Sequence, residues 1–427
     1  MSNPLVAADV RVDAEGPDAV LSCAVRGAGG DLPPRLWLRV PAADRALLSL
    51  SADAFLPVLL VAAMQRRQRL VLEGPVSPAL LAGASRVMAI FERWSERAGE
   101  ALGAIEIVAT PAAPGARGEA AAAFFSAGVD SFYTLLSNHA RYPVGDSRLI
   151  THLVVMQGYD LRLDQDAIYG RLLQDAGEVA GVLDKRVVPV RTNIRAALES
   201  VHWNRYGYGT MLTSVGHALS AGVHTVYVPS SGRPFPELAG HDVSSTPELC
   251  AWWSTETLEF VYHPVHLTRT EKIRFLARSP LALAKLRVCW ENRDGAYNCG
   301  RCEKCLRTMV ELALCGVLAQ SGQFPPALDL ARIEALSVPP RIQAYWRRLL
   351  EASERSPEHA ALAAALRRPL ERLVWGESRM GRMDRRLSAT LARLGLTGAR
   401  ARRLDDRLLG GGVAALLRRL QRRAFGS

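Results

Sequence analysis

The chain has 427 residues, of which 49% are hydrophobic and 22% are charged. These fractions are close to those of globular proteins and exclude a disordered or fibrous chain. The longest apolar run, at residues 55–64, is shorter than the roughly 20 residues that cross a bilayer. The first ten residues lack the basic and apolar regions of a signal peptide, so we expect a cytoplasmic protein with no transmembrane segment.

The net charge of +11 is concentrated near the C-terminus. Residues 361–427 hold 16 arginines, no lysine and five acidic residues, which leaves residues 1–360 neutral. Within this basic region, Val413, Leu416 and Leu420 recur at helical spacing opposite arginines and predict an amphipathic helix. We interpret it as a solvated or self-packed face. The alternative, contact with nucleic acid or a membrane surface, is not favoured.

Residues 1–110 mix strand and helix patterns. Strands are expected at residues 36–40, 70–73 and 105–108. Ser77 followed by Pro78 predicts the start of a helix that runs to about Ala98, because serine caps helices and proline suits the first helical position. No catalytic signature is present here, so we expect a small α/β module that docks on the next domain of the chain.

Strand and helix patterns alternate between residues 120 and 320, after an Ala-, Gly- and Pro-rich linker. Such alternation predicts an α/β domain with a parallel sheet covered by helices on both faces. Residues 325–427 are expected to form a helical, Arg-rich region. The expected strands are 121–125, 152–156, 186–190 and 224–229, and the expected helices are 131–138, 169–180 and 210–220.

The segment 124–131, with the sequence FFSAGVDS, joins the first of these strands to its helix. Such a turn presents backbone N–H groups and a helix N-terminus to an anion. Asp130 is suited to bind the Mg²⁺ that accompanies a nucleoside triphosphate, and the missing Gly-Lys-Ser/Thr excludes a Walker A loop. The alternative is a tight turn that merely caps a helix. The expected nucleotide-binding residues are Ser126, Ala127, Gly128, Val129, Asp130 and Ser131.

Four of the seven cysteines lie within 17 residues, at Cys289, Cys299, Cys302 and Cys305. A CxxCxxC turn with one earlier cysteine can surround a single metal ion. Four soft thiolates favour Zn²⁺, with an iron–sulfur cluster as second choice, over four unliganded core cysteines. A closed site has no open position for water, so we expect a structural metal and no chemistry there.

The segment SAGVDS resembles the SGGxDS signature of the PP-loop ATP pyrophosphatases, and together with the four cysteines it resembles the 7-cyano-7-deazaguanine synthase family. The resemblance covers residues 120–316. It implies a Rossmann-like fold, similar to that of adenine nucleotide alpha hydrolases, which binds ATP with Mg²⁺. It also implies that residues 157–160 contact the adenosine. Ala127 replaces a glycine of the family, and its methyl group is tolerable there if its φ is negative.

A capping box, Thr268 to Glu271, predicts a helix that carries Lys272. The resemblance places a basic residue of this segment near the active site, and we expect Lys272 to stabilise negative charge on phosphate. The alternative is an ordinary surface lysine. Ser230 and Ser231 follow the strand 224–229, at the end where ligands bind to open α/β sheets.

The resemblance implies an AMP-forming, ligase-like enzyme with Asp130 and Lys272 as catalytic residues. Such an enzyme adenylates a carboxylate or amide oxygen of a small-molecule or carrier- or protein-bound acceptor, which a nitrogen nucleophile then attacks. Two alternatives remain. The basic C-terminal region favours a PP-loop tRNA-modifying enzyme of the thiolation type, whereas the neutral remainder disfavours it. Ala127 is the only support for a zinc-stabilised interaction protein with a decayed nucleotide site.

Overall fold

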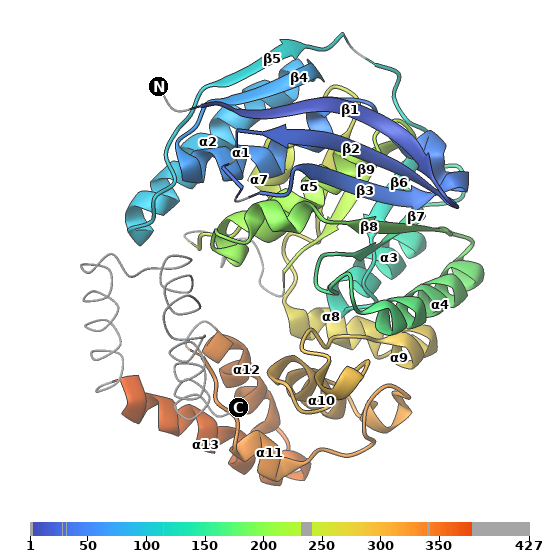
Figure 1. Cartoon of the computed structure of the whole chain (residues 1–427). Helices are drawn as coiled ribbons and strands as arrows, with labels where there is room; N and C mark the ends of the chain where they lie inside the picture. The colour runs from blue at the N-terminus through green and yellow to red at the C-terminus, as the bar shows by residue number, and fades with distance from the viewer. Residues whose placement is uncertain are drawn as a thin grey trace. The chain divides into compact units, whose positions relative to one another are not determined.

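The computed structural model describes residues 3–27, 29–30, 32–113, 115–231, 241–339 and 342–377 (Figure 1). The chain forms two compact units, residues 1–290 and 291–427. The three parts expected from the sequence, 1–110, 120–320 and 325–427, stay a prediction. The amphipathic helix expected around residues 413–420 lies outside the described residues.

The first unit contains one ten-stranded sheet in the order β10-β9-β6-β7-β8-β3-β2-β1-β4-β5. The expectation of a parallel sheet is correct only in part. β1, β2, β3 and β8 pair with one another in antiparallel fashion, and the remaining neighbours are parallel. The strands are β1 (Leu5–Glu15), β2 (Asp18–Arg26), β3 (Arg35–Pro41), β4 (Leu70–Val76), β5 (Ile107–Pro111), β6 (Ala120–Phe124), β7 (Ile150–Gln157), β8 (Arg186–Thr192), β9 (Val223–Pro229) and β10 (Glu259–His263).

The alternation expected after residue 120 is confirmed. Each of β6, β7 and β8 is followed along the chain by a longer helix: α3 (Val129–Arg141), α4 (Asp166–Leu183) and α5 (Tyr208–Ala218). β9 and the edge strand β10 come next, and then the short helices α8 (Arg269–Leu276) and α9 (Pro280–Lys285). β10 was not expected from the sequence, and it is only five residues long. β6 lies between β7 and β9, so the strand order reverses direction beside β6.

The N-terminal strands continue the same sheet and do not form a separate one. The junction is the pairing of β3 with β8, where Leu38 lies opposite Thr192. The side chain of Asn193 reinforces it, because its amide accepts from Trp37 N at 2.8 Å and donates to Arg35 O at 2.9 Å. This strand pairing explains how the N-terminal α/β module adjoins the rest of the unit.

Two long helices belong to this N-terminal part, α1 (Leu56–Arg66) and α2 (Pro78–Ala98). The apolar run at residues 55–64 is buried throughout, within one continuous hydrophobic core. The predicted start of α2 is confirmed, since Ser77 caps the helix by accepting from Leu80 N at 3.0 Å. Gly83 of α2 lies against the main chain of Trp252, at the end of the short helix α7 (Pro247–Trp252).

The second unit is helical in its described part, as expected. Its helices are α10 (Glu303–Leu314), α11 (Leu330–Glu334), α12 (Gln343–Ser353) and α13 (Ala360–Glu377). Leu306 and Val310 of α10 pack with Trp346 of α12 and Leu366 of α13 in one hydrophobic core. None of the helices in the described ranges of the chain combines the length and apolar character that crossing a membrane requires.

Gly83→Ala tests the close approach of α2 to α7. The added Cβ would overlap the carbonyl oxygen of Trp252, so we expect a loss of at least about 2 kcal/mol in the free energy of unfolding. Gly177→Ala is the matched control, because Gly177 lies in α4 with open space around it and alanine favours a helix by about 1 kcal/mol. Urea unfolding measures the free energy of unfolding of both variants. Equal values for Gly83→Ala and Gly177→Ala would contradict the close approach of α2 to α7.

Candidate functional site

The reversal of strand order beside β6 defines the candidate site. β6, β7, β9 and β10 are parallel, so their carboxyl ends meet at one edge of the sheet. Open α/β sheets bind ligands at this edge, where the strand order reverses. The connection from β6 to α3, which we call the β6–α3 loop (residues 125–128), begins at this point.

The β6–α3 loop is a tight turn held by serine hydroxyls. Ser131 donates to Gly128 O at 3.0 Å and accepts from Ser126 N at 3.3 Å. Ser126 is exposed, whereas Ala127, Val129 and Ser131 are buried. An added Cβ on Gly128 would lie 3.1 Å from Ser126 Oγ, so the turn has little room for a larger residue.

Ala127 has a φ of 55°, so the condition under which its methyl group would fit without strain, a negative φ, is not met. The turn from β6 into α3 is completed in a few residues, and a left-handed residue makes that reversal. Glycine adopts this conformation freely, whereas an L-residue with a Cβ loses roughly 1–2 kcal/mol. The loop is therefore strained at the position where the resembling family has glycine.

Lys272 and Asp130 meet at the carboxyl edge of the sheet. Lys272 Nζ lies 2.7 Å from Asp130 Oδ1, 2.8 Å from Ser230 Oγ and 3.1 Å from Ser231 O. The side chain of Lys272 is 0% exposed, so it is no surface lysine. A buried ammonium is stable only where oxygen atoms replace its water. Here the oxygens come from residues that follow β6 and β9, and the lysine itself follows β10.

The surroundings of this pair are cationic and polar. Arg269, which is also buried, places its guanidinium 3.9 Å from Asp130 Oδ2. Burial, together with the charge of Lys272, lowers the pKa of His263 to about 4. Burial also raises the pKa of Tyr262 to about 12, and its hydroxyl accepts from Ser231 N at 3.1 Å. At neutral pH both side chains are therefore uncharged, and the charges of the site are those of Asp130, Arg269 and Lys272.

The residues expected to contact adenosine stabilise their own turn. Gln157 is fully buried, and its Nε2 donates to Arg162 O at 3.1 Å and Leu163 O at 3.3 Å. Gly158 N donates to Leu161 O at 2.7 Å, while Asp160 is exposed. This turn follows β7, which is the neighbour of β6 in the sheet, so it lies at the same edge as the β6–α3 loop. Contact with adenosine stays a prediction.

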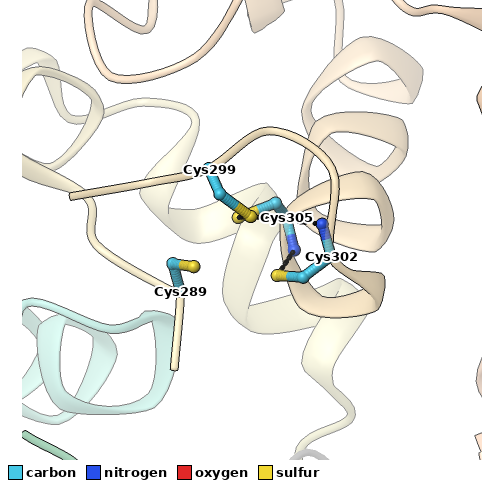
Figure 2. A group of neighbouring side chains, drawn as sticks. All are labelled: Cys289, Cys299, Cys302 and Cys305. Atoms are coloured by element: carbon cyan, nitrogen blue, oxygen red, sulfur yellow. Dashed lines mark hydrogen bonds between the residues drawn. The ribbon is translucent and has the colours of Figure 1, made fainter. Parts of the chain in front are cut away.

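The four cysteines converge on a common centre (Figure 2). Their sulfur atoms all lie within 4.8 Å of one another, and Cys299 Sγ lies 4.0 Å from Cys305 Sγ. A tetrahedral Zn²⁺ with Zn–S bonds of about 2.3 Å separates its sulfurs by about 3.8 Å. The spacing therefore fits one metal ion such as zinc, and it is tight for a cluster of several iron atoms.

Main-chain groups support thiolates at this centre. Cys302 N donates to Cys299 Sγ at 3.3 Å, and Cys305 N donates to Cys302 Sγ at 3.5 Å. Cys302 is also the N-cap of α10, where the helix dipole favours negative charge. Four protein ligands would close the coordination sphere of a tetrahedral ion, so the centre suits a structural role.

The remaining cysteines lie apart from this centre. Burial raises the pKa of Cys23 and of Cys250 to about 12, so both thiols stay neutral in the core. Cys315 is half-buried. None of these three belongs to the metal-binding group found among the described residues.

One contributor to the site, Arg287, was not expected from the sequence. Its main-chain N–H donates to Ala127 O at 2.8 Å, in the β6–α3 loop. Arg287 belongs to no expected motif, and its position two residues before Cys289 is the only signal in the sequence.

Comparison with known proteins gives no match: no family model fits the chain, and no curated protein or solved structure resembles it at a significant level. The resemblance to PP-loop enzymes therefore depends on the motif residues themselves.

Substitution of the cysteines tests the metal centre. The purified wild-type chain is expected to bind one equivalent of Zn²⁺, and Cys299→Ser and Cys302→Ser are expected to lose most of it, since each removes a thiolate ligand. Elemental analysis after extensive dialysis measures the stoichiometry. The control Cys250→Ser should retain one equivalent; a wild-type chain without bound metal would contradict the assignment.

His263→Gln tests the burial of this imidazole. The folded protein keeps His263 neutral to about pH 4, whereas in the unfolded chain it takes up a proton near its ordinary pKa of 6.5. The free energy of unfolding should therefore fall as the pH drops from about 6.5 to about 4, by up to about 1.4 kcal/mol per pH unit.

Urea unfolding at several pH values measures this slope. His263→Gln should have a shallower slope than the wild type across that range. The exposed His241, changed to Gln, is the matched control, because it removes an imidazole that lies outside the core. Equal slopes for the wild type and His263→Gln would show that the imidazole titrates alike in both states.

Proposed function

We propose that this chain is an ATP-dependent enzyme of the PP-loop type, with a Rossmann-like nucleotide-binding sheet, that forms AMP and pyrophosphate. The observation that carries the proposal is the convergence of Asp130, Lys272 and Ser230 on the two strand ends beside the reversal of strand order. A buried ammonium beside a helix N-terminus favours the binding of a polyphosphate.

The β6–α3 loop and the first turn of α3 would hold the phosphates. α3 is 13 residues long, and the N–H groups at its start have no partner within the helix. Ser126, which is exposed, adds a hydroxyl donor. Lys272 would neutralise negative charge as it develops on the leaving pyrophosphate.

Asp130 would hold Mg²⁺. Its carboxylate is only partly buried, with 29% of the side chain exposed, and it already binds one cation, the ammonium of Lys272. One carboxylate together with phosphate oxygens and water matches the ligand set of Mg²⁺ in nucleotide sites. The ion would supply charge neutralisation and orientation of the phosphates, and Lys272, which contacts the same carboxylate, would add a second positive charge.

The reaction class is the one that the resemblance to PP-loop enzymes implies. An oxygen of the acceptor attacks the α-phosphorus of ATP, the bond to the bridging oxygen breaks, and pyrophosphate leaves. A nitrogen nucleophile then attacks the adenylated carbon; AMP leaves with the oxygen, and the nucleophile gives up a proton. The acceptor is a small molecule or a carrier- or protein-bound group. The four-cysteine centre has no open coordination position, so its metal would be structural.

Product analysis tests the proposal. The full-length protein is incubated with labelled ATP, Mg²⁺ and a small-molecule extract, and the nucleotide products are separated. Wild type should release AMP and pyrophosphate. Asp130→Asn and Lys272→Met should release at least about 100-fold less, because the first removes the carboxylate that would hold Mg²⁺ and the second removes the cation that would face the phosphates.

The control is Asp164→Asn, an exposed carboxylate after β7 that should leave AMP formation unchanged. Release of ADP and phosphate by the wild type would overturn the proposal. So would the absence of ATP binding in a titration with Mg²⁺, since the expected site requires no acceptor to bind nucleotide.

A further inference from the structure

The segment 286–289 touches the β6–α3 loop through its main chain. Arg287 N donates to Ala127 O at 2.8 Å, and Arg287 O lies 3.5 Å from the position that a Cβ on Gly128 would take. Leu286, Arg287, Val288 and Cys289 are all buried, and none belongs to a helix or strand. The main chain of this irregular segment thus packs directly against the β6–α3 loop.

The hydrogen bond acts on the strained residue of the loop. Ala127 is wholly buried and has a φ of 55°. An alanine leaves this conformation unless its surroundings favour it. The N–H of Arg287 can donate to the Ala127 carbonyl in only one orientation of that carbonyl, so it favours the left-handed conformation over the alternatives.

The other end of the segment is a metal ligand. Cys289 follows Arg287 by two residues, and its sulfur belongs to the four-cysteine group. A metal ion bound there fixes Cys289, and two residues of extended chain span only about 7 Å. Arg287 N therefore has little freedom when the metal is bound.

We propose that metal binding at the four cysteines holds the β6–α3 loop in its left-handed conformation, through the main chain of residues 287–289. Polyphosphate affinity then depends on a metal that touches no phosphate. The effect on polyphosphate affinity rests on the proposed function, whereas the effect of the metal on the loop conformation does not.

Hydrogen exchange of the full-length protein, without any nucleotide, tests the coupling directly. Zinc-loaded and chelator-treated protein are compared by mass spectrometry. Amides of residues 126–131 should exchange at least tenfold faster after metal removal, and also in Cys289→Ser. Residues 78–98, in α2, should be unchanged, and Cys250→Ser should behave as wild type.

Pyrophosphate titration measures the consequence for binding. Removal of the metal should weaken pyrophosphate binding by about tenfold. Ala127→Gly should abolish most of this dependence, because glycine adopts the left-handed conformation without the help of Arg287. This variant keeps the coupling testable even where Cys289→Ser fails to fold.

The outcomes separate the two proposals. Equal exchange of residues 126–131 with and without metal, or equal acceleration in α2, would overturn the coupling while the ATP assay stands on its own. Metal-dependent exchange without any binding of pyrophosphate or ATP would support the coupling and overturn the proposed function. Equal pyrophosphate affinity with and without metal would overturn the statement that the metal strengthens polyphosphate binding.

Discussion

The buried ammonium of Lys272 is the constraint on which the candidate site depends. A charge without water must be surrounded by oxygen atoms, and Asp130, Ser230 and Ser231 supply them within 3.2 Å. These groups follow β6 and β9, while the lysine follows β10. Removal of one partner would leave an uncompensated charge, so the three strand ends are held in one geometry.

Local chemistry explains which parts of the fold could be predicted. Ser77 with Pro78, and Thr268 with Glu271, predict helix starts because the capping hydrogen bonds form between residues three apart. The strands after residue 120 could be predicted because buried parallel strands are short apolar runs between helices. The cysteine spacing predicts one metal centre for the same local reason, and the four sulfurs do converge.

Features that depend on distant contacts could not be predicted. β3 pairs with β8 about 150 residues away, and nothing in the sequence of either strand specifies the other. The positive φ of Ala127 contradicts the ordinary preference of alanine, and it is explained only by the turn into α3 and by Arg287. Arg287 itself could not be found because its contribution comes from the main chain, which every residue type carries.

The two candidate sites differ in whether they leave room for a ligand from outside the chain. The four cysteines could satisfy a tetrahedral ion with protein ligands alone, so any effect of that ion on the rest of the chain would pass through the segments that carry the ligands. The site of Asp130 and Lys272 has the opposite character: its carboxylate is partly exposed, and the exposed Ser126 adjoins it along the loop. Under the two proposals, the closed centre would supply rigidity to residues 287–289, and the open site, whose loop accepts a hydrogen bond from Arg287, would supply the chemistry. Arg287 N donates to the β6–α3 loop and lies two residues before the ligand Cys289, so the main chain of residues 287–289 is the proposed link between the two sites.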